Sequence, residues 1–104
     1  MDAALKTRIE ATINQSPTVL FMKGLPESPM CGFSARAVQI LNLLDVPFTG
    51  VDILQDPDLR QGLKDYGQWP TFPQLYHKGQ LVGGCDIMTE MYQSGELHDV
   101  LCAA

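Results

Sequence analysis

Cys31 is the residue whose type and surroundings point most directly to chemistry. It stands in the segment PMCGFS at residues 29–34, so a serine occupies the position three residues after it. A C-x-x-C pair can close a local disulfide, but Cys31 and Ser34 cannot, because that bond needs a sulfur at both ends. Any disulfide or metal chemistry at Cys31 therefore needs a second sulfur or a metal ion from outside this segment.

The position of Cys31 predicts that its thiol ionises readily. Apolar residues at helical spacing predict a helix over residues 33–44, which begins just after the cysteine. Unpaired backbone N–H groups at a helix N-terminus stabilise a thiolate and lower the pKa of a cysteine from its free value of about 8.5. Lys23 would add a positive charge nearby. We therefore interpret Cys31 as a nucleophile or metal ligand rather than as a small buried hydrophobe.

The other cysteines and the histidines do not form a recognisable metal site. Cys31, Cys85 and Cys102 are an odd, widely spaced set, which is not typical of a small secreted disulfide scaffold and favours a reducing compartment. No two cysteines have the short spacing of a structural zinc site. His77, in a predicted hairpin turn, and His98, on the last predicted helix, are expected at the surface.

Length, composition and charge narrow the class of protein. The 104 residues predict one domain, residues 1–104, and 45% hydrophobic with 18% charged residues is typical of a globular protein. A net charge of −5 with scattered basic residues argues against binding to nucleic acid. No apolar stretch approaches the ~20 residues that cross a membrane. We expect a cytoplasmic protein, or one of an organellar matrix if a presequence has been removed.

The elements that must position Cys31 follow an alternating pattern of helices and strands. Hydrophobic periodicity and breaker residues predict helices over residues 3–14, 33–44, 56–66, 86–92 and 96–101, and strands over 18–22, 48–53, 71–76 and 80–82. Residues 24–29 are rich in proline and glycine and are expected to be a loop. The first two strands should pair in parallel by a right-handed crossover, and the late hairpin should extend the sheet antiparallel. The predicted class is α/β, a four-stranded mixed sheet flanked by helices.

Four motifs together resemble one known family. They are KG at residues 23–24 with prolines at 26 and 29, CGFS at 31–34, WPTFPQL at 69–75 and GGCD at 83–86. In this order they are similar to the monothiol, CGFS-type glutaredoxins, and the resemblance covers nearly the whole chain. It implies a thioredoxin-like fold in which Pro73 is cis and lies beside Cys31. From spacing alone, an ordinary trans proline that begins a strand is the favoured interpretation of Pro73.

The resemblance also implies a binding site for glutathione, the peptide thiol that these proteins use. A cis proline leaves the backbone groups of the preceding residue, Phe72, available to an extended ligand. Lys23 and Arg60 would face the glycyl carboxylate of glutathione. Judged without the family, both are also typical of solvated surface charges.

The other end of glutathione would lie at the turn that precedes the fourth predicted helix. Backbone donors at Gly84 and Cys85 would meet the γ-glutamyl carboxylate, and Asp86 would meet the ammonium group. Asp86 is by its position also a helix N-cap. Trp69 and Thr71 are expected either to shape the same groove or, for Trp69, to pack against the core.

One reactive cysteine leaves two functions open. A [2Fe-2S] cluster usually needs four thiolates, and the resemblance implies that two chains each supply Cys31 while two glutathiones supply one sulfur each. The protein would then be a cluster carrier, dimeric with the cluster and monomeric without it, that serves acceptor proteins and BolA-like partners. The long segment from Lys23 to Cys31 favours this reading.

The alternative is a weak glutathione-dependent disulfide oxidoreductase. Its Cys31 thiolate would attack a protein–glutathione disulfide, and glutathione or Cys85 would resolve the product. Cys85 is equally typical of a small buried thiol, and Cys102 is expected to have no role.

Overall fold

The structure, a computed structural model, describes residues 1–102 and is built on a four-stranded sheet in the order β4-β1-β5-β6. Strand β1 (Thr18–Met22) pairs in parallel with β4 (Thr49–Asp52) and antiparallel with β5 (Gln74–His77). Strand β6 (Gln80–Gly83) completes the hairpin with β5. The predicted mixed sheet and its strand directions are confirmed.

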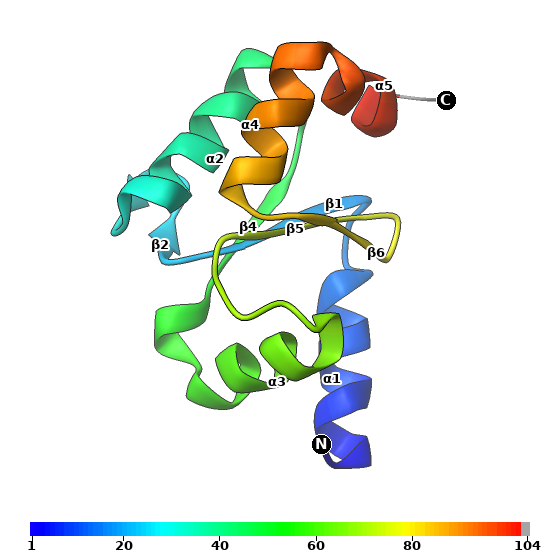
Figure 1. Ribbon diagram of the computed structural model, residues 1–104. Helices are drawn as coiled ribbons and strands as arrows, with labels where there is room; N and C mark the ends of the chain where they lie inside the picture. Colours follow the sequence, from blue (N-terminus) through cyan, green and yellow to red (C-terminus); the bar gives the residue numbers. More distant parts are fainter. Residues whose placement is uncertain (103–104) are drawn as a thin grey trace.

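Helices cover both faces of the sheet (Figure 1). On one side lie α1 (Ala3–Ile13) and α3 (Pro57–Gly67), and on the other lie α2 (Gly32–Leu43), α4 (Cys85–Ser94) and α5 (Glu96–Cys102). A short 3-10 turn, η1 (Ile53–Gln55), leads from β4 to α3. No helix among residues 1–102 is long and apolar enough to cross a membrane.

The sheet separates two apolar clusters, and β1 contributes to both. Val19 and Phe21 pack with the α1–α3 cluster, whereas Leu20 and Met22 pack with the α2–α4–α5 cluster. All five residues of β1 are buried because the strand has neighbours on both edges and helices on both faces. This buried strand ends at Met22, directly before Lys23, and so determines where the cysteine segment leaves the sheet.

Three of the predicted element boundaries need correction. The segment expected as a loop contains two short strands, β2 (Gly24–Leu25) and β3 (Ser28–Pro29), which pair antiparallel. The strand expected from residue 71 begins only at Gln74, because Pro73 has no N–H to donate to the sheet. The strand expected over residues 48–53 is confined to β4. The Phe72–Pro73 bond is cis, as the resemblance implied.

Two individual side chains also differ from the prediction. His77 is not at the surface: it ends β5, is 9% exposed, and its Nδ1 lies 2.9 Å from Thr18 Oγ1. Burial, and then the charge of Lys78, lowers the pKa of His77 and favours its neutral form. Asp86 is not an N-cap, because Gly84 holds that position in α4 and Asp86 lies in the first turn. His98 is exposed as expected.

Candidate functional site

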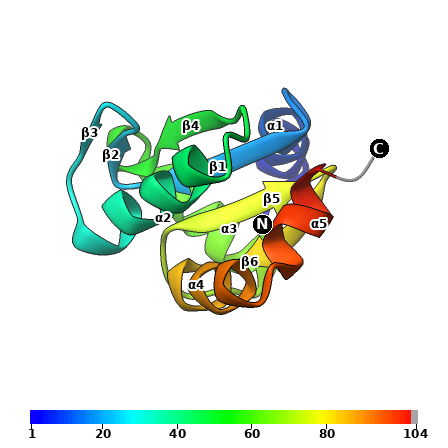
Figure 2. The ribbon, with the colours of Figure 1, turned by 90° about the horizontal axis from the view of Figure 1, so that it is seen from above.

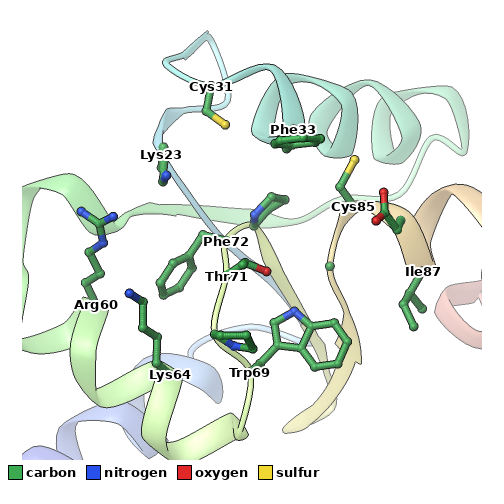
Figure 3. Close-up of a pocket in the computed structure, with 14 residues that line it drawn as sticks. Lys23, Cys31, Phe33, Arg60, Lys64, Trp69, Thr71, Phe72, Cys85 and Ile87 are labelled. Carbon is green, nitrogen blue, oxygen red and sulfur yellow. The ribbon is translucent and has the colours of Figure 1, made fainter.

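A cavity of about 380 Å³ opens where β1 ends, between the first turns of α2 and α4, the middle of α3 and the segment before β5. Figure 3 shows its lining side chains. Every residue that we predicted for the site lines it: Lys23, Cys31, Arg60, Phe72, Gly84, Cys85 and Asp86. The fold therefore brings together residues that are spread over more than half of the chain.

Cys31 lies at the N-cap position of α2, with an extended backbone at φ −156° and ψ 138°. Its side chain makes no capping hydrogen bond and is partly exposed. The backbone N–H of Ser34 lowers the pKa of the Cys31 thiol most, and the Phe33 N–H, the Lys23 charge and the Ser34 hydroxyl act in the same direction. Partial burial opposes them, and the net result is a lowered pKa. The predicted ionised thiol at a helix start is therefore consistent with the geometry.

Ser34 has a structural task that the sequence did not reveal. Its side chain is fully buried, and its Oγ accepts a hydrogen bond of 3.0 Å from the backbone N–H of Lys23. The hydroxyl thus ties the end of β1 to the first turn of α2, which lie on either side of the segment that leads to Cys31. The oxygen that replaces the second sulfur of a dithiol motif is therefore part of the scaffold of the site.

We expect Ser34→Ala to lower the free energy of unfolding by about 1–2 kcal/mol, because the Lys23 N–H would lose its partner in a partly buried place. Urea unfolding of the reduced protein measures this change. Ser28→Ala, at an exposed serine in β3, is the matched control and should change the value by less than about 0.5 kcal/mol. Equal effects of the two substitutions would show that the Ser34 bond contributes little.

One end of the cavity is cationic. Arg60 and Lys64 lie one turn apart on α3, and Lys23 faces the same space from the end of β1 (Figure 3). Among residues 1–102 the ion pairs are Arg8–Asp56 and His98–Asp99, so these three cations have no acidic partner there. Lys64 was missing from our prediction, although its position four residues after Arg60 placed it on the same helix face. An unpaired cationic cluster of this kind suits a carboxylate.

The opposite end lies at the start of α4. Gly84 is the N-cap, so no side chain covers the first N–H groups of the helix. A Cβ at Gly84 would lie 3.1 Å from Trp69 Nε1 and 3.2 Å from the Pro73 carbonyl oxygen, so a larger residue would be tightly packed there. Asp86 is exposed in the first turn and lines the cavity. Backbone donors and a carboxylate therefore stand side by side.

The wall between these ends is largely apolar. Phe72 is buried, and Trp69 and Thr71 line the same cavity, so both expected groove residues take part in it. The indole Nε1 of Trp69 is buried and has no hydrogen-bond partner in the described part of the chain. Phe33, on the exposed rim, and Ile87 belong to the lining and were not predicted.

The three cysteines lie in different surroundings. Cys85 is 8% exposed but still lines the cavity, which fits both predictions for it, a resolving thiol and a small buried thiol. Cys102 is exposed at the end of α5 and is not among the lining residues. Within residues 1–102 no three His, Cys, Asp or Glu side chains converge to hold a metal ion. Cys31 is thus the more accessible of the two thiols that line the cavity.

Comparisons with known proteins identify the family to which this chain belongs. The glutaredoxin family model matches residues 18–82. Glutaredoxin 4 of Haemophilus ducreyi is 54% identical over 94 residues, which are 90% of this chain and 88% of that protein. Monothiol glutaredoxin-S11 of rice is 55% identical over 97 residues, 93% of this chain but only 20% of its own length. This chain thus spans about a fifth of that longer relative.

A solved structure agrees with the sequence comparisons. The solution structure of reduced poplar apo GrxS14 superposes with a TM-score of 0.80 at 54% identity and covers 91% of this chain and 87% of that one. The expected thioredoxin-like fold is thereby confirmed. With one cysteine in the CGFS segment and Ser34 in place of the second, the chain belongs to the glutaredoxin family, in its monothiol type.

Proposed function

We propose that the protein carries a [2Fe-2S] cluster, held between two copies of the chain by Cys31 of each and by the thiols of two bound glutathiones. The observation that carries this proposal is a single accessible thiol, with its pKa lowered, at the rim of a cavity whose two ends suit the charges of glutathione. Because Ser34 supplies no sulfur, the thiol stays available to a metal instead of closing a local disulfide. The cluster is the cargo of this function.

The cavity has the size and charge pattern that glutathione requires. Its volume of about 380 Å³ lies in the range of small-molecule sites. In our proposal Lys23, Arg60 and Lys64 bind the glycyl carboxylate, because charge-assisted hydrogen bonds are the strong ones. The backbone of Phe72 lies along the middle of the peptide. The cysteinyl sulfur of the ligand would then reach the space beside Cys31.

The γ-glutamyl end of glutathione is an amino acid group with one negative and one positive charge. The free N–H groups at the start of α4, near Gly84 and Cys85, favour a carboxylate there. Asp86, exposed at the same turn, offers an acceptor to the ammonium group. This neighbouring pair of donor and acceptor supports glutathione over a simple carboxylate or a plain thiol.

The count of sulfur atoms supports a dimer. A [2Fe-2S] cluster usually takes four thiolates, and among residues 1–102 no three His, Cys, Asp or Glu side chains gather into a metal-binding group. Two chains and two glutathiones provide the four. Met30 is 70% exposed and Phe33 63% exposed beside the thiol, so the rim offers apolar surface that a second copy could cover. Acceptor proteins, BolA-like partners among them, belong to the same proposal, and so does a cytoplasmic or organellar location.

Anaerobic reconstitution with ferrous iron, sulfide and glutathione tests the proposal. We expect a coloured species with visible absorption, a mass of two chains by light scattering, and two glutathiones per cluster. N-acetylcysteine, which lacks the ammonium group and the glycyl carboxylate, should not support assembly in place of glutathione. A full cluster formed with N-acetylcysteine, or on a single chain, would contradict the model.

A second function is supported by the lowered pKa of Cys31 and by Cys85 in the same cavity. The Cys31 thiolate would attack the glutathione sulfur of a protein–glutathione disulfide and release the protein thiolate. A second glutathione thiolate would attack the same sulfur, which frees Cys31 and forms oxidised glutathione. Steady turnover of a glutathionylated protein, with no cluster formed under the conditions above, would favour this oxidoreductase over the carrier.

A further inference from the structure

The segment between β1 and α2 forms an arm that lies against the edge of the sheet. Residues 24–30 contain the paired strands β2 and β3, and β2 contacts β4, the outermost strand on that side. Figure 2 shows β2 and β3 beside β4. The arm ends at Met30, whose N–H donates to the Lys23 carbonyl oxygen at 2.9 Å. This hydrogen bond joins the two ends of the arm, and Cys31 follows directly after it.

Asp52, the last residue of β4, holds the arm at its start. Its Oδ1 accepts hydrogen bonds from the backbone N–H of Gly24 at 3.0 Å and from that of Leu54 at 2.9 Å. The second bond caps the turn η1 and joins residues that are only two positions apart. The first joins residues 28 positions apart and has no part in capping. It fixes the amide that directly follows Lys23.

Gly50, in the middle of β4, provides the second contact. A Cβ at this position would lie 2.3 Å from Pro26 Cγ and 2.6 Å from Pro26 Cδ. The backbone of Gly50 is not in the left-handed region, so its φ does not require glycine. What requires glycine is the ring of Pro26, which rests directly on the backbone of β4. A proline ring cannot turn aside as a flexible side chain would.

Two hydrogen bonds hold the backbone at Lys23. Its own N–H donates to Ser34 Oγ in α2, and the next N–H, of Gly24, donates to Asp52 in β4. Two consecutive amides are thus held by side chains from two different elements, which fixes the direction in which Lys23 leaves the sheet. Lys23 lies in the cationic end of the cavity, which Cys31 also lines.

We propose that docking of the arm on β4, through Asp52 and Gly50, positions Lys23 and Cys31 and thereby sets the reactivity of the thiol. Asp52 and Gly50 do not line the cavity, so they act as positioning residues through the arm. The inference deepens the proposed function, because the thiol that it concerns is the proposed cluster ligand. Its test uses the protein without cluster or glutathione, so a failed carrier hypothesis would leave it unaffected.

The first test is a double-mutant cycle on Gly50 and Pro26. Gly50→Ala should push the arm from β4 and lower the rate of Cys31 alkylation at pH 7 several-fold. Mass spectrometry of the peptide that contains Cys31 reads this rate separately from Cys85 and Cys102. Gly50→Ala with Pro26→Ala removes the clash and should restore much of the rate. A folded Gly50→Ala protein with wild-type alkylation, or no recovery in the double variant, would overturn the proposal.

The second test separates the two bonds of Asp52. Asp52→Asn keeps an oxygen that accepts from Gly24 and Leu54 and loses the charge, whereas Asp52→Ala loses both. Their difference isolates the two hydrogen bonds from the charge, and exchange at each amide tells the two bonds apart. Asp52→Ala should speed hydrogen exchange at the Gly24 amide and slow Cys31 alkylation at pH 7, and Asp52→Asn should recover both. If Asp52→Ala alters exchange only at Leu54 and leaves the rate of Cys31 alkylation at pH 7 unchanged, Asp52 is merely the cap of η1 and the proposal fails.

Discussion

Cys31→Ser is expected to abolish cluster assembly entirely, whereas Cys85→Ser should retain a cluster-bound dimer. A serine hydroxyl does not ionise near neutral pH and cannot replace a thiolate ligand of iron. Because Cys31 is the partly exposed cysteine of the cavity, its loss in both copies leaves only the two glutathione sulfurs. Cys85 is 8% exposed and stands at the end of the groove where we place the γ-glutamyl group, so its sulfur is not needed. Anaerobic reconstitution followed by visible absorption and light scattering measures the outcome.

Cys102→Ser supplies the matched control for this experiment. That thiol is exposed on α5 and is not among the residues that line the cavity. Its substitution should leave the yield of cluster and the dimer unchanged, which separates a specific ligand from a general effect of removing a thiol. Full retention of the cluster by Cys31→Ser, or its loss in Cys85→Ser, would require a different set of ligands.

The sequence predicted those parts of the fold that local patterns determine. Breaker residues followed by helical spacing placed Cys31 at the start of α2, and the apolar run over residues 18–22 gave β1 with its observed bounds. Six of the seven candidate site residues lie in motifs next to the ends of helices or strands, and Arg60 joins them from the middle of α3. Lys64 could have joined them, since it lies one helical turn after Arg60.

The remaining features depend on contacts between distant segments, which no local pattern carries. Strands of two residues, such as β2 and β3, have no periodicity to recognise, so the arm was expected as a loop. His77 looked like a turn residue, but it ends β5 and shares a cavity of about 280 Å³ with Phe48 and with Leu101 of α5. The hydrogen bond from Lys23 to Ser34 likewise becomes visible only when β1 and α2 are placed in space.

Replacing both cations of α3, in Arg60→Gln/Lys64→Gln, should weaken glutathione binding by roughly 30-fold, about 2 kcal/mol, because two charge-assisted hydrogen bonds at a solvated rim are lost. Each single substitution should cost roughly five-fold. NMR titration of the reduced monomer measures the affinity. Lys6→Gln/Lys78→Gln removes the same charge at two residues that do not line the cavity, and it should change the affinity little.

Ionic strength gives this prediction a second readout. Salt screens exposed charges, so raising it should weaken binding to the wild-type protein and to the Lys6→Gln/Lys78→Gln control, but should have less effect on Arg60→Gln/Lys64→Gln. A folded α3 double variant that kept wild-type affinity would place the glycyl carboxylate elsewhere, with Lys23 as the remaining cation of the cavity. The salt dependence would then be the same in all three proteins. A reduced salt dependence confined to the α3 variant would instead identify the paired cations of this helix as the carboxylate site.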